Sequence, residues 1–257
     1  MTAPFFYGSA DDLESVVVGD LLTLGGEEGR HAVTVKRLDV GEPLLIGDGL
    51  GTVVHAAVSA VRGKDQLDAT VSQVTRTPPT TGQVAVIQAL VKGDRMERAI
   101  ESMTEAGVDH IVLWQATRSI ARVTGVAQEK LHAKVTGRAR QAAKQARRPW
   151  VPTVSEVLTT DQLADVLAGY AVRIALHEDA DRSLPEVLAP AADNGFPPTV
   201  ALIVGPEGGI APAELAALAD LDVQSAVMGS AIMRSSTAGT VALGWVLGAL
   251  GRWSVEH

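Results

Sequence analysis

The first third of the chain alternates short apolar runs with glycine and aspartate, a pattern typical of a small β-rich domain. The runs cover residues 44–46, 53–58 and 69–74. Residues 75–82 include two prolines and have the composition of a linker, because proline removes a backbone donor and biases its predecessor to extended backbone. We therefore predict one domain over residues 1–76 and a second over residues 77–257.

Beyond the linker, apolar runs alternate with segments that have helical periodicity. Asp94 is expected to cap the first helix, with Glu97 at the capping-box position and Gly107 at its end. We expect strands at residues 84–91, 110–113, 171–176, 200–204 and 223–228, and helices at residues 94–107, 128–147 and 236–250, with a short helix opened by Pro212. Strands that alternate with helices predict an α/β fold with a mostly parallel sheet covered on both faces.

Composition narrows the class of protein. The chain contains no cysteine, which excludes disulfides, thiolate metal sites and a cysteine nucleophile, and is compatible with the cytoplasm. Its six histidines lack metal-ligand spacing, so no metal is expected. The N-terminus does not resemble a secretory signal, and the apolar stretch 237–250 is 14 residues long, short of the ~20 needed to cross a membrane.

Two glycine-rich segments are candidates for chemistry. The segment from Gly205 to Ile210 follows an apolar strand, where backbone can approach a ligand closely, although an ordinary strand-to-helix turn has the same composition. It matches neither a dinucleotide-binding fingerprint nor a phosphate-binding P-loop. The segment from Met228 to Gly239 precedes the last helix, which Ser235, Ser236 or Thr237 could cap. Arg234 has few acidic neighbours in sequence, which favours an anionic or polar ligand.

A local basic segment contrasts with the net charge of −8. Residues 130–148 contain seven cations and no acid. Separately, the histidines form no catalytic cluster, His177 beside Glu178 included. A solvated surface is the usual explanation for such a segment. However, the seven cations have no acids in the segment with which to form i,i+4 ion pairs, so contact with a phosphate backbone is the alternative.

Several segments, in this order and spacing, resemble the RsmE family of 16S ribosomal RNA uridine methyltransferases over nearly the whole chain. The matching segments are residues 30–38, 47–49, 92–97, 105–108, 118–119, 142–145, 147–148, 205–209, 232–234 and 237–238. The resemblance implies a PUA-like β-barrel, followed by a SPOUT-type α/β domain whose C-terminal segment threads a trefoil knot. It also implies a homodimer that acts on 16S ribosomal RNA or the small ribosomal subunit.

The resemblance implies methylation of uracil N3 with S-adenosyl-L-methionine, and it assigns site residues. Arg234 is the candidate for stabilising the uracil anion, and Glu207 is a weaker candidate for positioning the cofactor or a base. The expected cofactor-binding residues are Leu176, His177, Glu178, Gly205, Pro206, Glu207, Gly208, Gly209, Ile210, Met228, Gly229, Ile232 and Met233. The expected RNA-binding residues are Arg30, Lys36, Arg37, Arg118, Lys134, Arg138, Arg140, Lys144, Arg147 and Arg148.

The chain departs from the family pattern at two places. The usual Ile-Leu-Arg-Thr-Glu-Thr-Ala is Ile-Met-Arg-Ser-Ser-Thr-Ala here, so Ser236 replaces a glutamate. The usual Thr-Glu-Arg-Ser is Ala-Thr-Arg-Ser from Ala116 onward, without its acid. A mechanism that needs the carboxylate at position 236 does not apply to this chain. Two rival functions remain: a ribose 2′-O-methyltransferase of the same knotted superfamily, and a non-catalytic ribosome-assembly factor that binds RNA.

Overall fold

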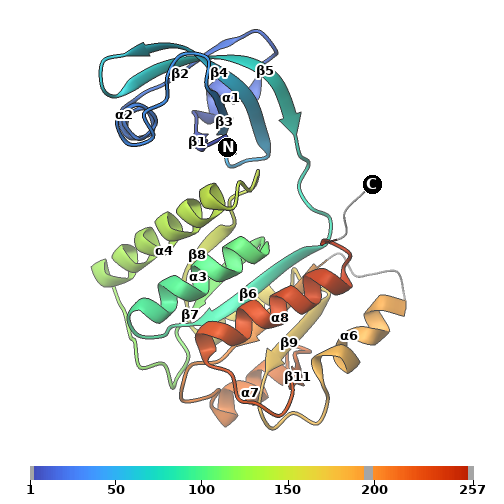
Figure 1. The fold of residues 1–257 in the computed structure, drawn as a ribbon. Coiled ribbons are helices and arrows are strands. Elements are labelled where there is room, and N and C mark those ends of the chain that lie inside the picture. Colours follow the sequence, from blue (N-terminus) through green and yellow to red (C-terminus); the bar gives the residue numbers. More distant parts are fainter. Residues whose placement is uncertain (1–2, 194–198, 254–257) are drawn as a thin grey trace. The chain divides into compact units, whose positions relative to one another are not determined.

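The computed structural model describes residues 3–193 and 199–253, which form two compact units (Figure 1). The first unit contains the described residues of Met1–Pro79 together with Ala143–Val151. The second contains those of Thr80–Ala142 and Pro152–His257. The division falls three residues beyond the predicted boundary, and nothing in the sequence pattern signals that residues 143–151 belong to the first unit.

The first unit is built on a five-stranded sheet with strand order β1-β3-β4-β5-β2. β1 pairs with β3 in parallel, and the remaining neighbours are antiparallel. The elements are β1 (Phe5–Tyr7), α1 (Ala10–Glu14), β2 (Leu21–Leu24), α2 (Gly26–Arg30), the π-helical turn η1 (His31–Val35), β3 (Pro43–Gly47), β4 (Thr52–Arg62) and β5 (Gln66–Arg76). The three predicted apolar runs lie in β3, β4 and β5, while β1 and β2 were not predicted.

The second unit contains a six-stranded sheet with strand order β11-β9-β10-β6-β7-β8, and every pair of neighbours is parallel. The elements are β6 (Gln83–Ala89), α3 (Asp94–Ala106), β7 (His110–Trp114), α4 (Val126–Gln145), β8 (Thr153–Leu158), the 3-10 turn η2 (Thr160–Gln162), α5 (Leu163–Leu167), β9 (Val172–Leu176), α6 (Leu184–Asp193), β10 (Thr199–Val204), α7 (Pro212–Ala219), β11 (Gln224–Ala226) and α8 (Ser235–Ala249). The predicted parallel sheet is confirmed. The sequence did not predict β8, α5 or α6. The threading of the knot stays a prediction.

Helices cover both faces of this parallel sheet, which explains its apolar strands. Successive residues of β6 point to opposite faces and are fully buried: Val84 and Val86 pack in the cluster with α3 and α8, and Ala85 and Ile87 pack in the cluster with α5 and α7. Figure 1 shows α3 beside α8 over the sheet. Helix α8 approaches closely because Gly239 has no side chain: a Cβ there would lie 3.2 Å from Met103 Sδ.

Two predicted helix caps are wrong by one residue. Gly93, with a φ of 66°, occupies the position before α3, and Asp94 is the first helical residue. Arg234 occupies the position before α8, so none of Ser235, Ser236 and Thr237 is the cap. The hydroxyl of Ser235 instead donates a hydrogen bond to the carbonyl of Gly205 at 2.6 Å.

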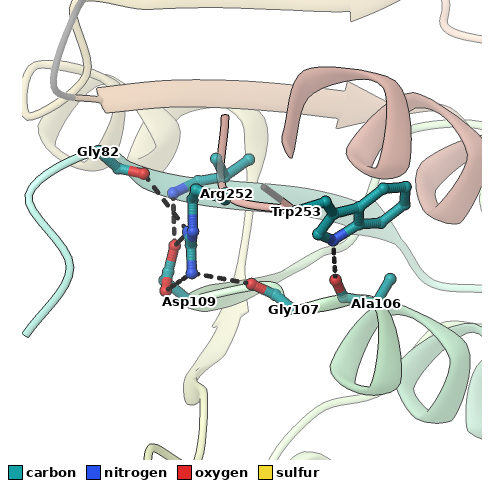
Figure 2. A network of polar contacts seen from close by, with 7 residues as sticks. Gly82, Ala106, Gly107, Asp109, Arg252 and Trp253 are labelled. Carbon is teal, nitrogen blue, oxygen red and sulfur yellow. Dashed lines mark hydrogen bonds and ion pairs between the residues drawn. The ribbon is translucent and has the colours of Figure 1, made fainter. Parts of the chain in front are cut away.

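Beyond α8, a polar network ties the end of the chain to the amino ends of β6 and β7 (Figure 2). The Arg252 guanidinium forms a two-point ion pair with Asp109, whose Oδ1 lies 3.1 Å from Nη2. Arg252 also donates to the carbonyls of Gly82 and Gly107, and Asp109 accepts from the Val84 N–H at 2.8 Å. Helix α8 therefore runs antiparallel to the strands and is fixed at both of its ends.

A second network holds the loop after β7 against the start of α7. The buried Glu214 carboxylate accepts from the Thr117 N–H at 2.8 Å, the Thr160 hydroxyl at 2.7 Å and the Ala211 N–H at 3.2 Å. Burial alone would raise the pKa of Glu214, but these hydrogen bonds to the charged form outweigh it, and the pKa lies below its usual 4.5. Glu214 therefore fixes the loop that carries Arg118 beside the Gly205–Ile210 loop.

Replacing Asp109 by Asn should lower the free energy of unfolding by about 2 kcal/mol, because it leaves a mostly buried guanidinium without its counter-ion. Urea unfolding of the whole chain measures this change. Asp222→Asn is the matched control, because its carboxylate is 97% exposed and lies 4.0 Å from Arg173, so its loss should cost less than about 0.5 kcal/mol. Equal effects of the two substitutions would contradict the role given to Arg252.

Replacing Glu214 by Gln should destabilise the fold by about 2 kcal/mol near neutral pH, because an amide offers fewer acceptor sites to three donors. Since the pKa of Glu214 is lowered by folding, its carboxylate stabilises the protein above the unfolded pKa of 4.5 and loses this effect as pH falls through the folded value. The difference between wild type and Glu214→Gln in urea unfolding should therefore shrink in acid. A difference that stays constant down to about pH 3 would refute this assignment.

Candidate functional site

Three loops meet at the carboxyl edge of the parallel sheet and enclose a pocket. They follow β9, β10 and β11, and they contain the residues that the sequence singled out around Leu176, Gly205 and Met228. The pocket has two adjoining hollows, of ≈ 280 Å³ and ≈ 330 Å³. Both hollows are lined by Leu176, His177, Glu178, Ile232, Met233 and Ala238. This position, outside the strand ends of an open α/β sheet, is where such folds bind small molecules.

Most of the expected cofactor-binding residues line this pocket. Gly205, Pro206, Glu207, Gly209, Ile210 and Arg234 line the first hollow, and Met228 and Gly229 line the second. Gly208 does not line it, because it lies against Arg118, whose Nη1 donates to the Gly208 carbonyl at 3.2 Å. Ser230, Ala231, Ser235 and Ala238 also line it and lie in the segment from Met228 to Gly239, and Val204 adjoins the other candidate segment. The sequence interpretation missed Asp179, Ala226 and Val227.

The pocket combines apolar side chains with polar groups of the loops. Leu176, Ile210 and Met233 supply apolar surface suited to a flat ring. His177 Nδ1 accepts a hydrogen bond from the Asp179 N–H at 3.2 Å. This bond favours the neutral tautomer with its proton on Nε2, which leaves that nitrogen as a donor for a ligand.

The charged groups at the first hollow differ in their partners. Glu207 forms an ion pair with Arg95 of α3, with Oε1 at 3.0 Å from Nη1, and its side chain is 22% exposed. Arg234 is exposed, and its side chain makes no hydrogen bond or ion pair with any residue in the described ranges. Its guanidinium is therefore available to an anionic or polar ligand, whereas the Glu207 carboxylate is already engaged.

Two further residues, Gln88 and Ser235, connect the strand β6 and the start of α8 to the Gly205–Ile210 loop. Gln88 of β6 is fully buried, and its Nε2 donates to the hydroxyl of Ser235 at 2.9 Å. Ser235 in turn donates to the Gly205 carbonyl. The sequence interpretation missed these two hydrogen bonds, although a glutamine inside an otherwise apolar run was a signal.

The expected RNA-binding residues divide between the two units. Arg30, Lys36, Arg37, Lys144, Arg147 and Arg148 belong to the first unit, and Arg118, Lys134, Arg138 and Arg140 belong to the second.

Three cations of the basic segment have acidic partners within the chain. Lys134 and Arg138 pair with Glu97 of α3 at 2.7 and 2.8 Å, and the bonds lower the pKa of that carboxyl. Lys144 pairs with Glu28 at 2.6 Å. The absence of acids from the segment itself therefore does not require phosphate to explain the cations, because acids distant in sequence supply counter-charge.

The described part of the chain has neither a metal-binding cluster nor a membrane-spanning helix. No group of three His, Asp or Glu side chains there is arranged to hold a metal ion. None of its helices combines the length and apolarity needed to span a membrane.

Comparison with known protein families identifies both units. Residues 78–247 match the family described as RNA methyltransferase domain, and residues 24–72 match the RNA methyltransferase PUA domain. The first match covers more than half of the chain and contains all three loops of the pocket. The predicted PUA-like first domain is thereby confirmed.

Individual relatives agree with these matches. The chain is 40% identical to the ribosomal RNA small subunit methyltransferase E of Mycobacterium bovis, over 100% of this chain and 95% of that protein. It is 28% identical to the Bacillus subtilis protein of the same name, over 86% of this chain and 87% of that protein.

Solved structures share the fold. A putative methyltransferase from Legionella pneumophila, in complex with S-adenosylmethionine, has a TM-score of 0.83 at 24% identity and covers 97% of this chain and 98% of its own. The Neisseria gonorrhoeae ribosomal RNA small subunit methyltransferase E, bound to the same cofactor, has a TM-score of 0.81 at 22% identity, with 96% and 98% covered. Sequence and fold together show that the chain belongs to the ribosomal RNA small subunit methyltransferase E family.

Proposed function

We propose that this chain transfers a methyl group from S-adenosyl-L-methionine to N3 of a specific uracil in 16S ribosomal RNA. Membership of the family makes it an RNA methyltransferase, and the ribosomal substrate follows from the names of its relatives. The observation that carries the choice of chemistry is the unpaired Arg234 guanidinium beside the pocket of the three loops.

The residues present fit the cofactor. An adenosine needs an apolar slot edged by backbone donors and acceptors, and the loops after β9, β10 and β11 offer both. Gly209, with a φ of 71°, lets one loop turn without a side chain in the pocket. Bound S-adenosylmethionine supplies a methyl group on a cationic sulfonium, which a nucleophile attacks in line.

Arg234 is the group that we assign to the uracil. N3 of uracil carries a weakly acidic proton, and its transfer to solvent water spreads negative charge over the two flanking carbonyl oxygens. A planar guanidinium with several donors can stabilise this charge as it develops, which lowers the barrier to methyl transfer. The side chain is free to do so because no acid of the described chain neutralises it.

Glu207 has a positioning role in this proposal. Its ion pair with Arg95 joins the Gly205–Ile210 loop to α3, so the carboxylate orients the cofactor loop and does not accept the N3 proton. Together with serine at position 236, this arrangement favours electrostatic stabilisation by Arg234 over proton removal by a carboxylate at position 207 or 236.

The first unit is proposed to bind the ribosomal RNA in the cytoplasm, where ribosomes assemble. Arg30, Lys36 and Arg37 are exposed in and beside η1, and none forms an ion pair within the described ranges. Their charge is therefore available to phosphate groups. Arg118, Lys134, Arg138, Arg140, Lys144, Arg147 and Arg148 remain proposals for RNA contact, with those in ion pairs contributing less.

A homodimer is proposed through α8. Val241 and Trp245 lie one turn apart on this helix and are 44% and 42% exposed, and Gly248 leaves open space beside them. Apolar side chains that recur at helical spacing on an exposed face are typical of a helix that packs against a partner. A second copy of the chain would bury this stripe.

Replacing Arg234 by Ala should abolish methylation of small-subunit RNA, and cofactor affinity should remain within about an order of magnitude. Tritium transfer from labelled S-adenosylmethionine measures the first quantity, and isothermal titration calorimetry measures the second. Arg234→Lys keeps the charge but not the planar fork, so it should recover only part of the rate. Turnover of Arg234→Ala at the wild-type rate would refute the role of Arg234.

Mass mapping of the RNA product distinguishes the rival functions. A methyl group on the uracil base supports the proposal, whereas a methyl group on ribose identifies a 2′-O-methyltransferase. An absence of any binding heat with S-adenosylmethionine would identify an RNA-binding assembly factor.

Replacing Trp245 by Glu should convert the dimer to a monomer, because a charge in the centre of the stripe opposes its burial. Sedimentation velocity at micromolar concentration measures the change. Val126→Glu is the matched control, because Val126 is 64% exposed on α4 and has no place in the stripe. A wild-type protein that sediments as a monomer would contradict the proposed dimer.

A further inference from the structure

Ser235 is the first residue of α8, and its hydroxyl links two of the loops that form the pocket. The side chain is almost fully buried, and its Oγ donates to the Gly205 carbonyl at 2.6 Å. The residue after Gly205 is Pro206, which has no N–H. The peptide between Gly205 and Pro206 therefore offers only the Gly205 carbonyl for hydrogen bonding. The orientation of this peptide at the pocket therefore depends on the Ser235 hydroxyl.

Gln88 fixes the direction of this hydrogen bond. Its amide Nε2 donates to Ser235 Oγ at 2.9 Å and to the Ala89 carbonyl at 3.1 Å. An amide turned the other way would take the Ser235 proton away from Gly205 and would set its oxygen against the Ala89 carbonyl. The two hydrogen bonds thus form a directed chain from Gln88 through Ser235 to Gly205.

The hydrogen bonds from Gln88 through Ser235 to Gly205 leave one buried oxygen of Gln88 unpaired, which costs free energy of folding. Gln88 Oε1 is buried and has no hydrogen-bond partner among the described residues. A buried oxygen without a hydrogen bond destabilises the folded state, so an apolar side chain at position 88 would stabilise the core more. Such a cost at the carboxyl end of β6, next to a pocket, indicates that the donor of Gln88 is kept for the loops and not for stability.

The hydrogen bond of Ser235 also helps to fix the backbone of Arg234. The Arg234 carbonyl accepts from the N–H groups of Thr237 and Ala238 at 2.8 and 2.9 Å, which joins it to α8. The next residue, Ser235, joins it to the Gly205 loop. The Arg234 side chain therefore projects from a backbone held on both sides, at a fixed distance from the loop beside it.

We propose that Ser235, oriented by Gln88, is a positioning residue for methyl transfer, which sets the Arg234 guanidinium in register with the Gly205–Ile210 loop. This inference rests on the proposed function of Arg234 and adds the residues that act through it. A displacement of about 1 Å at a reacting group can reduce the rate by about 100-fold, so the effect of losing the hydroxyl should fall on turnover.

Ser235→Ala should lower kcat by roughly 10- to 100-fold while the affinity for S-adenosylmethionine changes by less than about threefold. Single-turnover methyl transfer and calorimetry measure the two quantities on the full chain, and thermal unfolding verifies the fold. Ser235→Thr keeps the hydroxyl and should retain most of the wild-type rate. Ser236→Ala is the matched control, because its hydroxyl has no hydrogen-bond partner in the part of the chain that the structure describes, and it should leave kcat unchanged.

Gln88→Leu tests whether Gln88 acts through the hydrogen bond of Ser235 to Gly205. It should reduce kcat less than Ser235→Ala does, and the double variant should be no slower than Ser235→Ala alone, because both changes break one pathway. Additive losses would overturn the chain from Gln88 to Ser235. A Ser235→Ala enzyme with wild-type kcat beside an inactive Arg234→Ala enzyme would overturn this inference and leave the proposed function intact. Wild-type turnover of Arg234→Ala would overturn the role given to Arg234, on which this inference rests.

Discussion

Helix α8 lies so close to the parallel sheet that a side chain at Gly239 would be crowded, and the geometry of the pocket depends on this contact. A Cβ on Gly239 would lie 3.2–3.3 Å from Met103, Val204 and Val86, so the helix sits deep between α3 and the strands. Because α8 runs antiparallel to the strands, its first residues reach the carboxyl edge of the sheet, where β10 ends. The same helix therefore contributes both core packing and Arg234.

The two ends of α8 are held by different chemistry, which suits their different roles. Near the C-terminal end, Arg252 and Asp109 form a charged, two-point contact that resists displacement of the helix (Figure 2). At the pocket, neutral hydrogen bonds from Gln88 and Ser235 set the loop without adding a charge.

The sequence predicts the architecture of the second unit well because burial on both faces of a parallel strand leaves a continuous apolar run, as in residues 200–204. It fails at β8, where the burial is partial, and at the helix starts, where Gly93 and Arg234 precede the helices without a side-chain cap. The pocket loops were predicted from glycine content and resemblance. The partners of Lys134, Arg138 and Lys144 were not, because Glu97 and Glu28 are distant in sequence and only folding brings them close.

For the proposed methylation at N3, the charges of the site bear on how the uracil is activated. A carboxylate base must be free to accept a proton, but of the two positions considered for this role Glu207 is held by Arg95 and position 236 carries a hydroxyl. A guanidinium needs no proton transfer of its own and acts by stabilising the uracil anion, so its placement matters more than its pKa. The parts of the fold that surround Arg234, from the close approach at Gly239 to the hydroxyl of Ser235, all act on placement. In the proposed function, these contacts hold the backbone of Arg234 at the pocket, where its positive charge can face the reacting base.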